Sequence, residues 1–390
     1  MSETLLHPNL ERVALARSSQ LTEHRRAFWG VMACFLVHGL VVATWVSRIA
    51  SVKSALHLGD GALGLALLGT AIGSVTAIPV SGALVVRRGS RLIARCMAAG
   101  FCLSLVAIPL AHDTATLFAA LLFYGAIAGA NDVAMNAQAV ATEKLLGTPA
   151  ISRFHAMFSI GGIVGTIAGA FIVGRGVPTA AHLVGAAAVF LVFALAATRL
   201  LADTRPRTTA RAAAAHPARV RLPVALSAIG FCIFLSEGAI ADWTGVFLHQ
   251  VLGAGAGLAP VGYAVFSAAM AIFRLSGDAI TLRIGRAATI RCGGAVAAAG
   301  AGFSCIVPLV FAAGGRIPEV SEGAGVATVS GFGYLGFLVG PPAIGFLSEL
   351  TSLRVGLFLL VLLSAGAAAM VGLVVRGVGG APNPFADEAN

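Results

Sequence analysis

Three acids and one base lie inside long apolar stretches of this chain: Asp132, Glu237, Asp242 and Arg274. A charged side chain near the centre of a bilayer costs about 2.5–3.5 kcal/mol on insertion scales, so it persists where it faces a cavity or finds a partner. A poorly hydrated cavity also favours the protonated form of a carboxylic acid, which then exchanges protons near neutral pH. We therefore predict proton-coupling roles for Asp132, Glu237 and Asp242. The alternative for Asp242 is a structural pair with a base at the outer rim.

Amide side chains surround Asp132. Asp132 and Asn136 are four residues apart and share one helix face, which could bind the hydroxyls or amines of a polar solute. The alternative is hydrogen bonding that only joins helices. The predicted solute contacts in this cluster are Asn131, Asp132, Asn136 and Gln138.

Other polar and aromatic side chains are candidates for the same site. His38 and Trp45 are seven residues apart on one face of the first apolar segment, and Trp243 follows Asp242. We predict solute contacts for all three, although a lone intramembrane histidine is more often a packing residue. We expect a gate or packing role for His155, together with Glu143.

The elements that carry these residues are helices in a membrane. Hydrophobic residues make up 58% of the 390 residues, charged residues only 11%, and the mean hydropathy is +0.92. Eleven segments reach the roughly 20 apolar residues that a spanning helix needs. Their apolar runs are continuous and too long for barrel strands. The fold class is thus an all-α, multi-pass integral membrane protein in a lipid bilayer.

The net charge of +10 follows the membrane topology. If the N-terminus is cytoplasmic, nearly all basic residues of the first eight segments fall inside, as the positive-inside rule requires. This placement argues against nucleic acid as a partner. We expect a protein of the bacterial inner (cytoplasmic) membrane, acting as a monomer.

The sequence shows no pattern for enzyme chemistry. Its glycine-rich runs lie inside apolar helices rather than between strand and helix. The six cysteines lack metal-ligand spacing and are interpreted as small hydrophobic residues. We therefore predict no enzymatic activity, no metal and no cofactor.

The chain divides into two halves with a shared motif. The stretch 202–221 carries prolines, alanines and arginines, and we interpret it as a cytoplasmic linker. Arg-x-Gly followed by a second arginine occurs at Arg87 to Arg91 and at Arg283 to Arg286, and such half-chain repeats are a transporter design. The predicted divisions are a tail at 1–27, a bundle at 28–201, the linker at 202–221, a bundle at 222–376 and a tail at 377–390.

The loop after the second segment resembles the signature of the major facilitator superfamily, Gly-x-Leu-x-Asp-Arg-x-Gly-Arg-Arg. Val86 replaces its usual acid and Ser90 a usual base. The resemblance implies two pseudo-symmetric six-helix bundles and alternating access. Conformational or motif roles are expected for Gly82, Arg87, Gly89, Arg91, Arg274, Asp278, Arg283 and Gly285, with Arg274 and Asp278 as a latch.

A narrower resemblance rests on Asn131 to Gln138, Phe154 to Gly162, Ser330 to Gly336 and Gly340-Pro341-Pro342. These motifs look like the MosC-like group of bacterial facilitators. The resemblance implies a sugar-like or amino-polyol solute and adds Tyr334 to the predicted solute contacts.

One departure concerns the number of helices. The superfamily has twelve, but 287–316 holds a single apolar run, so about one hairpin's worth of chain is missing. Either the last two helices invert, or this run re-enters without crossing.

We predict a proton-coupled secondary transporter of a small polar solute. The alternatives are a drug or metabolite efflux carrier and a non-transporting scaffold or sensor.

Overall fold

The structure is a computed structural model, and it describes residues 7–148, 150–202, 221–284 and 322–377. All secondary structure in these ranges is helical, as predicted. The helices are α1 (His7–Val46), α2 (Ile49–Ala55), α3 (Asp60–Arg88), α4 (Ser90–Ser104), η1 (Leu105–Leu110), α5 (Thr114–Leu146), α6 (Ile151–Gly174), α7 (Thr179–Arg199), α8 (Arg221–Gln250), α9 (Val261–Ile284), α12 (Glu322–Leu350) and α13 (Leu353–Gly377).

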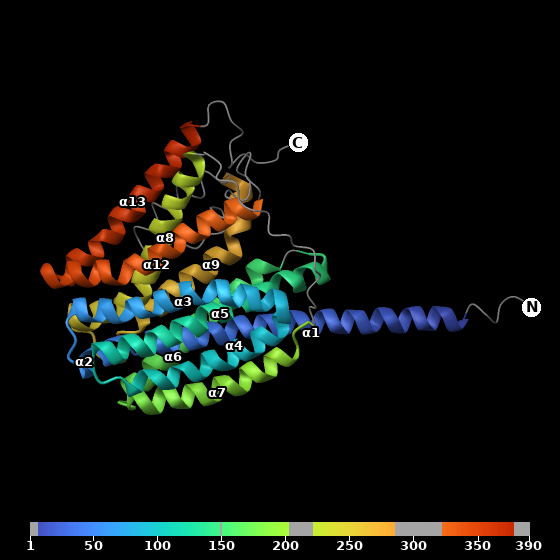
Figure 1. Ribbon diagram of the computed structural model, residues 1–390, viewed down its shortest axis with the longest axis horizontal. Helices are drawn as coiled ribbons and strands as arrows, with labels where there is room; N and C mark the ends of the chain where they lie inside the picture. Colours follow the sequence, from blue (N-terminus) through green and yellow to red (C-terminus); the bar gives the residue numbers. More distant parts are fainter. Residues whose placement is uncertain (1–6, 149, 203–220, 285–321, 378–390) are drawn as a thin grey trace, which may run out of the picture.

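These helices account for ten of the eleven predicted segments. Seven spans among the described residues are long and apolar enough to cross a membrane, and shorter apolar stretches of 10–17 described residues lie in α9, α12 and α13. The remaining segment, 287–313, and the linker at 203–220 lie outside the described residues. Helix α1 begins at His7, well before the predicted first span, and Figure 1 shows it extending far beyond its neighbours.

Helices α1 and α3 to α7 pack on one another, and so do α8, α12 and α13. Helix α9 contacts α8 of the second group, and α2 also contacts α8. The two groups meet mainly where α3 packs on α12 and α6 packs on α9. The two contacts are equivalent by pseudo-symmetry. Helices α3 and α9 are the second spans of their halves, and α6 and α12 are the last but one spans of theirs. Figure 1 shows α8 and α13 inclined to the stack of α3 to α7. The arrangement agrees with the predicted pseudo-symmetric bundles.

Glycines at four-residue spacing bring helix backbones together inside the first bundle. A Cβ added to Gly161 or Gly165 would clash with α1, and one added to Gly73 or Gly125 would clash across the contact of α3 and α5. The α6 glycines therefore allow a close approach of α6 to α1.

Both bundles are in contact at one end of the molecule, which we call the α2 end. A Cβ on Gly64 of α3 would lie 2.7 Å from the carbonyl oxygen of Pro341 in α12. The N–H of Gly61 donates to Glu349 Oε2 over 2.9 Å, and Lys53 of α2 donates to the side chain of Gln250. This end is closed by contacts between the bundles.

The same contacts decide the direction of the last helices. Glu349 lies at the α2 end, so α12, which is about 43 Å long at 1.5 Å per residue, begins at the opposite end. Helix α9 begins near the end of α8, where Gly262 contacts Thr244, and also ends at the opposite end. The last described residue before 285–321 and the first after it therefore lie at the same end. The predicted alternative in which the last two helices invert is wrong.

Candidate functional site

The predicted central residues separate into several groups, and the first is a pair inside the first bundle. Asn131 of α5 and His38 of α1 form a hydrogen bond of 2.8 Å between Nδ2 and Nδ1, and both side chains are buried. The His38 ring also lies 4.7 Å from Phe101 and 5.7 Å from Phe158, measured between centroids. This enclosed position corresponds to the packing alternative for His38.

Asp132 points elsewhere, because one helical residue turns the chain by about 100°. Its carboxylate accepts a hydrogen bond of 3.0 Å from Asn136 Nδ2, which also donates to the Asp132 carbonyl oxygen over 2.9 Å. Both side chains are half-buried. The predicted shared face is therefore present, and Asn136 holds the Asp132 side chain along the helix.

Asp242 of α8 lies at the contact between the bundles. Tyr124 of α5 is within electrostatic range of both Asp242 and Tyr263 of α9, so this group draws on both halves. Asp242 forms no ion pair with any residue that the structure describes, so the predicted alternative of a pair with a base is not observed. The Tyr124 hydroxyl is buried, and in the described part of the chain no group pairs with it.

The other predicted central residues have varied surroundings. Glu237 is half-buried in α8, five residues or about 7.5 Å along the helix from Asp242. Trp45 and Trp243 are both buried in the main apolar core, and Trp243 Nε1 has no hydrogen-bond partner among the described residues. Tyr334 lies in α12, but its side chain is outside the described part.

Gln138 lies near the opposite end of the molecule. Its Nε2 donates to Ser90 Oγ over 2.9 Å and to the carbonyl oxygen of Ala202 over 3.1 Å. These bonds connect α5 to the start of α4 and to the end of the first bundle. This geometry corresponds to the helix-joining alternative that the sequence left open for the amide cluster.

The signature loop forms a tight connection between α3 and α4. Gly89 has a φ of 85°, which a side chain would disfavour, and it is the only residue between the two helices. Arg91 donates to the carbonyl oxygen of Arg199 at the end of α7 over 3.3 Å, while Arg87 is exposed and Gly82 half-buried. The loop thus attaches α3 and α4 to α7.

The remaining predicted gating residues are only partly described. The His155 ring lies 5.0 Å from that of Phe35, and Glu143 accepts from the N–H of Ala150 over 2.6 Å, capping α6. Arg283 is exposed. Arg274 and Asp278 lie in α9 with side chains outside the described part, and Gly285 is outside it altogether.

The sequence analysis missed Tyr124 and Tyr263. A signal was available, because the chain has only three tyrosines, and Tyr124 lies within electrostatic range of both Tyr263 and Asp242. A phenol is unusual among so many aliphatic side chains and carries a polar group into the core.

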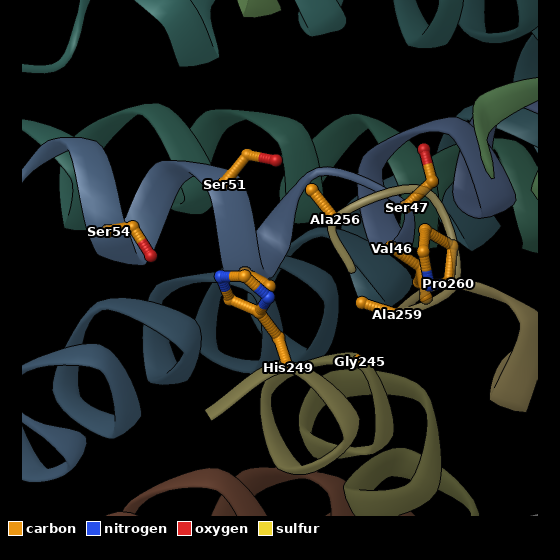
Figure 2. Close-up of a pocket in the computed structure, with 10 residues that line it drawn as sticks. Val46, Ser47, Ser51, Ser54, Gly245, His249, Ala256, Ala259 and Pro260 are labelled. Carbon is orange, nitrogen blue, oxygen red and sulfur yellow. The ribbon is translucent and has the colours of Figure 1, made fainter. Parts of the chain in front are cut away.

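A cavity of about 190 Å³ lies at the α2 end between the two bundles. Figure 2 shows the His249 ring reaching from α8 toward α2. Residues from the end of α1, from α2, from α8 and from the segment before α9 form its walls: Val46, Ser47, Ala50, Ser51, Ser54, Gly245, His249, Ala256, Ala259 and Pro260.

Comparison with known families agrees with this architecture. A model described as the Major Facilitator Superfamily matches residues 27–315. The chain belongs to this superfamily, and it is a multi-pass membrane transporter whose solute the family does not specify. Families of this kind are transporters rather than enzymes, in line with the predicted absence of enzymatic activity.

Curated relatives place the chain in the MosC-like group. It is 34% identical over 359 residues to an uncharacterized MFS-type transporter of Yersinia pestis, covering 86% of this chain and 93% of that protein. It is 31% identical over 353 residues to the membrane protein MosC of Rhizobium meliloti, covering 85% and 86% of the two chains.

Solved structures share the fold at low sequence identity. A mutant of the nucleoside transporter NupG superposes with a TM-score of 0.71 at 11% identity, covering 89% of this chain and 99% of that one. A bacterial homologue of the human lysosomal transporter Spinster, in an inward-facing and occupied conformation, gives 0.69 at 14% identity, covering 93% and 98%.

The alignments to the Yersinia protein and to a transporter of Sinorhizobium fredii, 31% identical, extend over 359 and 361 positions but use 86% of this chain, about 335 of its 390 residues. About two dozen positions of each alignment therefore have no counterpart here.

Proposed function

We propose that this protein is a proton-coupled secondary transporter that moves a small polar solute by alternating access. The observation that carries the proposal is Asp242, a half-buried acid of α8 that lies within electrostatic range of Tyr124 in the other bundle. A rocking motion of one bundle against the other changes the surroundings of such a group directly.

Asp242 is the proposed coupling residue. It is a half-buried carboxylic acid without an ion-pair partner among the described residues. Its charge is poorly compensated while the α2 end is closed, which favours the protonated form. Access to water in another state of the transporter favours release of the proton. Glu237 and Asp132 are the further candidates for a proton path.

The proposed solute is sugar-like or an amino-polyol. Asp132 and Asn136 offer a carboxylate and an amide on one helix face, which suits hydroxyl and amine groups. A nucleoside transporter is among the structural neighbours, and a nucleoside also carries a sugar ring. We therefore include nucleosides in the solutes to be tested.

The proposed orientation has the N-terminus in the cytoplasm of a bacterium and the α2 end on the outer side of the inner membrane. Basic residues support it, since Arg87, Arg88, Lys144 and Arg199 lie at the ends of α3, α5 and α7 away from the α2 end. The closed α2 end then corresponds to an inward-facing state.

The test is solute-driven proton movement in proteoliposomes that contain a pH-sensitive dye. Polyols, sugars, amino sugars and nucleosides are added in turn. We expect one class to move protons in the wild type, and Asp242→Asn to abolish that movement because an amide does not titrate.

Asp113→Asn is the matched control. Asp113 is exposed and caps α5 through Thr116, and asparagine caps a helix equally well. This variant should transport like the wild type. Equal proton movement in Asp242→Asn, or solute uptake by the wild type without proton movement, contradicts the proposed coupling.

A further inference from the structure

We propose that the cavity at the α2 end is a binding site for a small neutral polyol, separate from the central group around Asp242. Nothing in the family membership assigns a ligand to this place. The inference is independent of the proposed transport function, because it concerns binding at a different set of residues.

The size of the cavity limits the ligand. Its 190 Å³ correspond to about six water molecules at about 30 Å³ each. This is room for a molecule of the size of a four- or five-carbon polyol. The first bundle contributes the end of α1 and α2, and the second contributes α8 and the segment before α9, so a ligand would touch both.

One wall includes three serines of the α1–α2 segment. Ser51 and Ser54 are three residues apart in α2 and share one face of that helix. Ser47 lies at the break between α1 and α2, where its hydroxyl donates to the carbonyl oxygen of Thr44 over 2.8 Å and lies against Gly169 of α6. The hydroxyls of Ser51 and Ser54 form no hydrogen bond with the residues that the structure describes, so both remain available to a ligand.

The opposite wall presents an imidazole whose tautomer is fixed by its surroundings. His249 Nδ1 lies 2.9 Å from the carbonyl oxygen of Ala254, and a carbonyl only accepts, so Nδ1 carries the proton. In the neutral ring Nε2 is then an acceptor. A hydroxyl group between His249 and the serines would donate to Nε2 and accept from a serine.

Charge argues for a neutral ligand. The ten lining residues include no aspartate, glutamate, lysine or arginine, so nothing at the wall balances a full charge. Val46, Ala50, Ala259 and Pro260 form an apolar surface beside the serines, which suits the C–H groups of a polyol.

Binding at this place favours the closed state of the α2 end. The cavity lies beside the hydrogen bond from Lys53 to Gln250, which already joins α2 to α8 across the two bundles. A ligand held by both walls adds contacts that exist only while the bundles meet. It therefore shifts the population toward that state.

The experiment is calorimetric titration of the full-length protein in lipid nanodiscs with erythritol and with xylitol. We expect saturable binding of one molecule per protein. Loss of one hydrogen bond weakens binding by about fivefold, so Ser51→Ala combined with Ser54→Ala should weaken it at least fivefold. His249→Asn should act similarly, because the asparagine amide can replace Nδ1 as the donor to Ala254 but offers nothing at Nε2.

Ser348→Ala is the matched control, since Ser348 is a buried serine near the end of α12 that does not line the cavity. Its affinity should equal that of the wild type. Binding of both polyols that never saturates overturns the proposal, as does equal affinity in the cavity variants. Binding that is lost in Tyr124→Phe but kept in the cavity variants places the polyol at the central group and also overturns it.

Discussion

Tyr124 is a residue whose hydroxyl is buried but has no hydrogen-bond partner in the part of the chain that the structure describes. Such a group destabilises the state in which it is left unpaired. In a transporter the missing partner can be the solute or a water that moves with it. The hydroxyl is within electrostatic range of Asp242, the proposed coupling residue, so we propose that it contacts the solute.

Replacement of this hydroxyl should separate stability from transport. In Tyr124→Phe we expect thermal stability to stay the same or rise, because no described hydrogen bond is lost, while the KM for the transported solute rises about fivefold. Thermal unfolding in detergent and uptake by proteoliposomes measure the two effects. A clear drop in stability with unchanged KM would show that Tyr124 has a structural role only.

The cluster around Asn131 shows how far residue types could predict the site. Four polar side chains in eight residues correctly indicated an unusual part of α5. The orientation of each side chain could not be predicted, because it depends on which polar groups the neighbouring helices bring close. Asn131 turns to His38 and Gln138 to Ser90, while Asp132 pairs with Asn136 along its own helix.

At the scale of elements, α3 and α4 are joined by Gly89 alone. Its φ of 85° and ψ of 146° define a conformation that is almost restricted to glycine and costs other residues about 1–3 kcal/mol. A longer connection would allow Arg91 to leave the end of α7. The glycine therefore has a conformational role that the signature resemblance implied without specifying it.

Gly89→Ala should lower the free energy of unfolding by about 1–3 kcal/mol. Gly185→Ala is the control, because Gly185 lies inside α7 and an added Cβ meets no atom within 4 Å. Alanine is the better helix former there, so stability should rise by up to about 1 kcal/mol. Unfolding in denaturant compares the two, and an equal effect of both would refute the conformational role of Gly89.

The four-residue glycine spacing in α6 is typical of a close helix contact, and α6 forms such a contact with α1. The partner could not be predicted, because Gly161 and Gly165 match any helix that brings a backbone close. Only the folded bundle selects α1. The contact of α3 with α12 could not be predicted either, because the two helices belong to different halves of the chain.

At the scale of the molecule, the two halves and their pseudo-symmetry could be predicted from the linker and the repeated motif. The closed α2 end could not, since it depends on pairs such as Gly61 and Glu349 that lie far apart in the chain. The directions of α9 and α12 also depend on such contacts, and they bring the end of α9 and the start of α12 to the same end of the molecule.

This topology makes a prediction for reporter fusions. A reporter after Arg316 and one after Arg376 should both report the cytoplasm, because the described ends of α9, α12 and α13 leave both positions on the side of Arg88. A fusion after Arg175, at the end of α6, should report the outer side. An external signal after Arg316 would contradict the assigned direction of α12.

The most direct test of alternating access is a pair of distances measured by spin labels in a background without native cysteines. One pair, at His57 and Thr351, reports the α2 end, and the other, at Lys144 and Ala369, reports the opposite end.

Gly64→Leu should open the α2 end, because an added Cβ already lies 2.7 Å from the Pro341 carbonyl. Gly185→Leu should change neither distance. We predict that in Gly64→Leu the first distance lengthens while the second shortens. A longer first distance with an unchanged or longer second one would contradict alternating access.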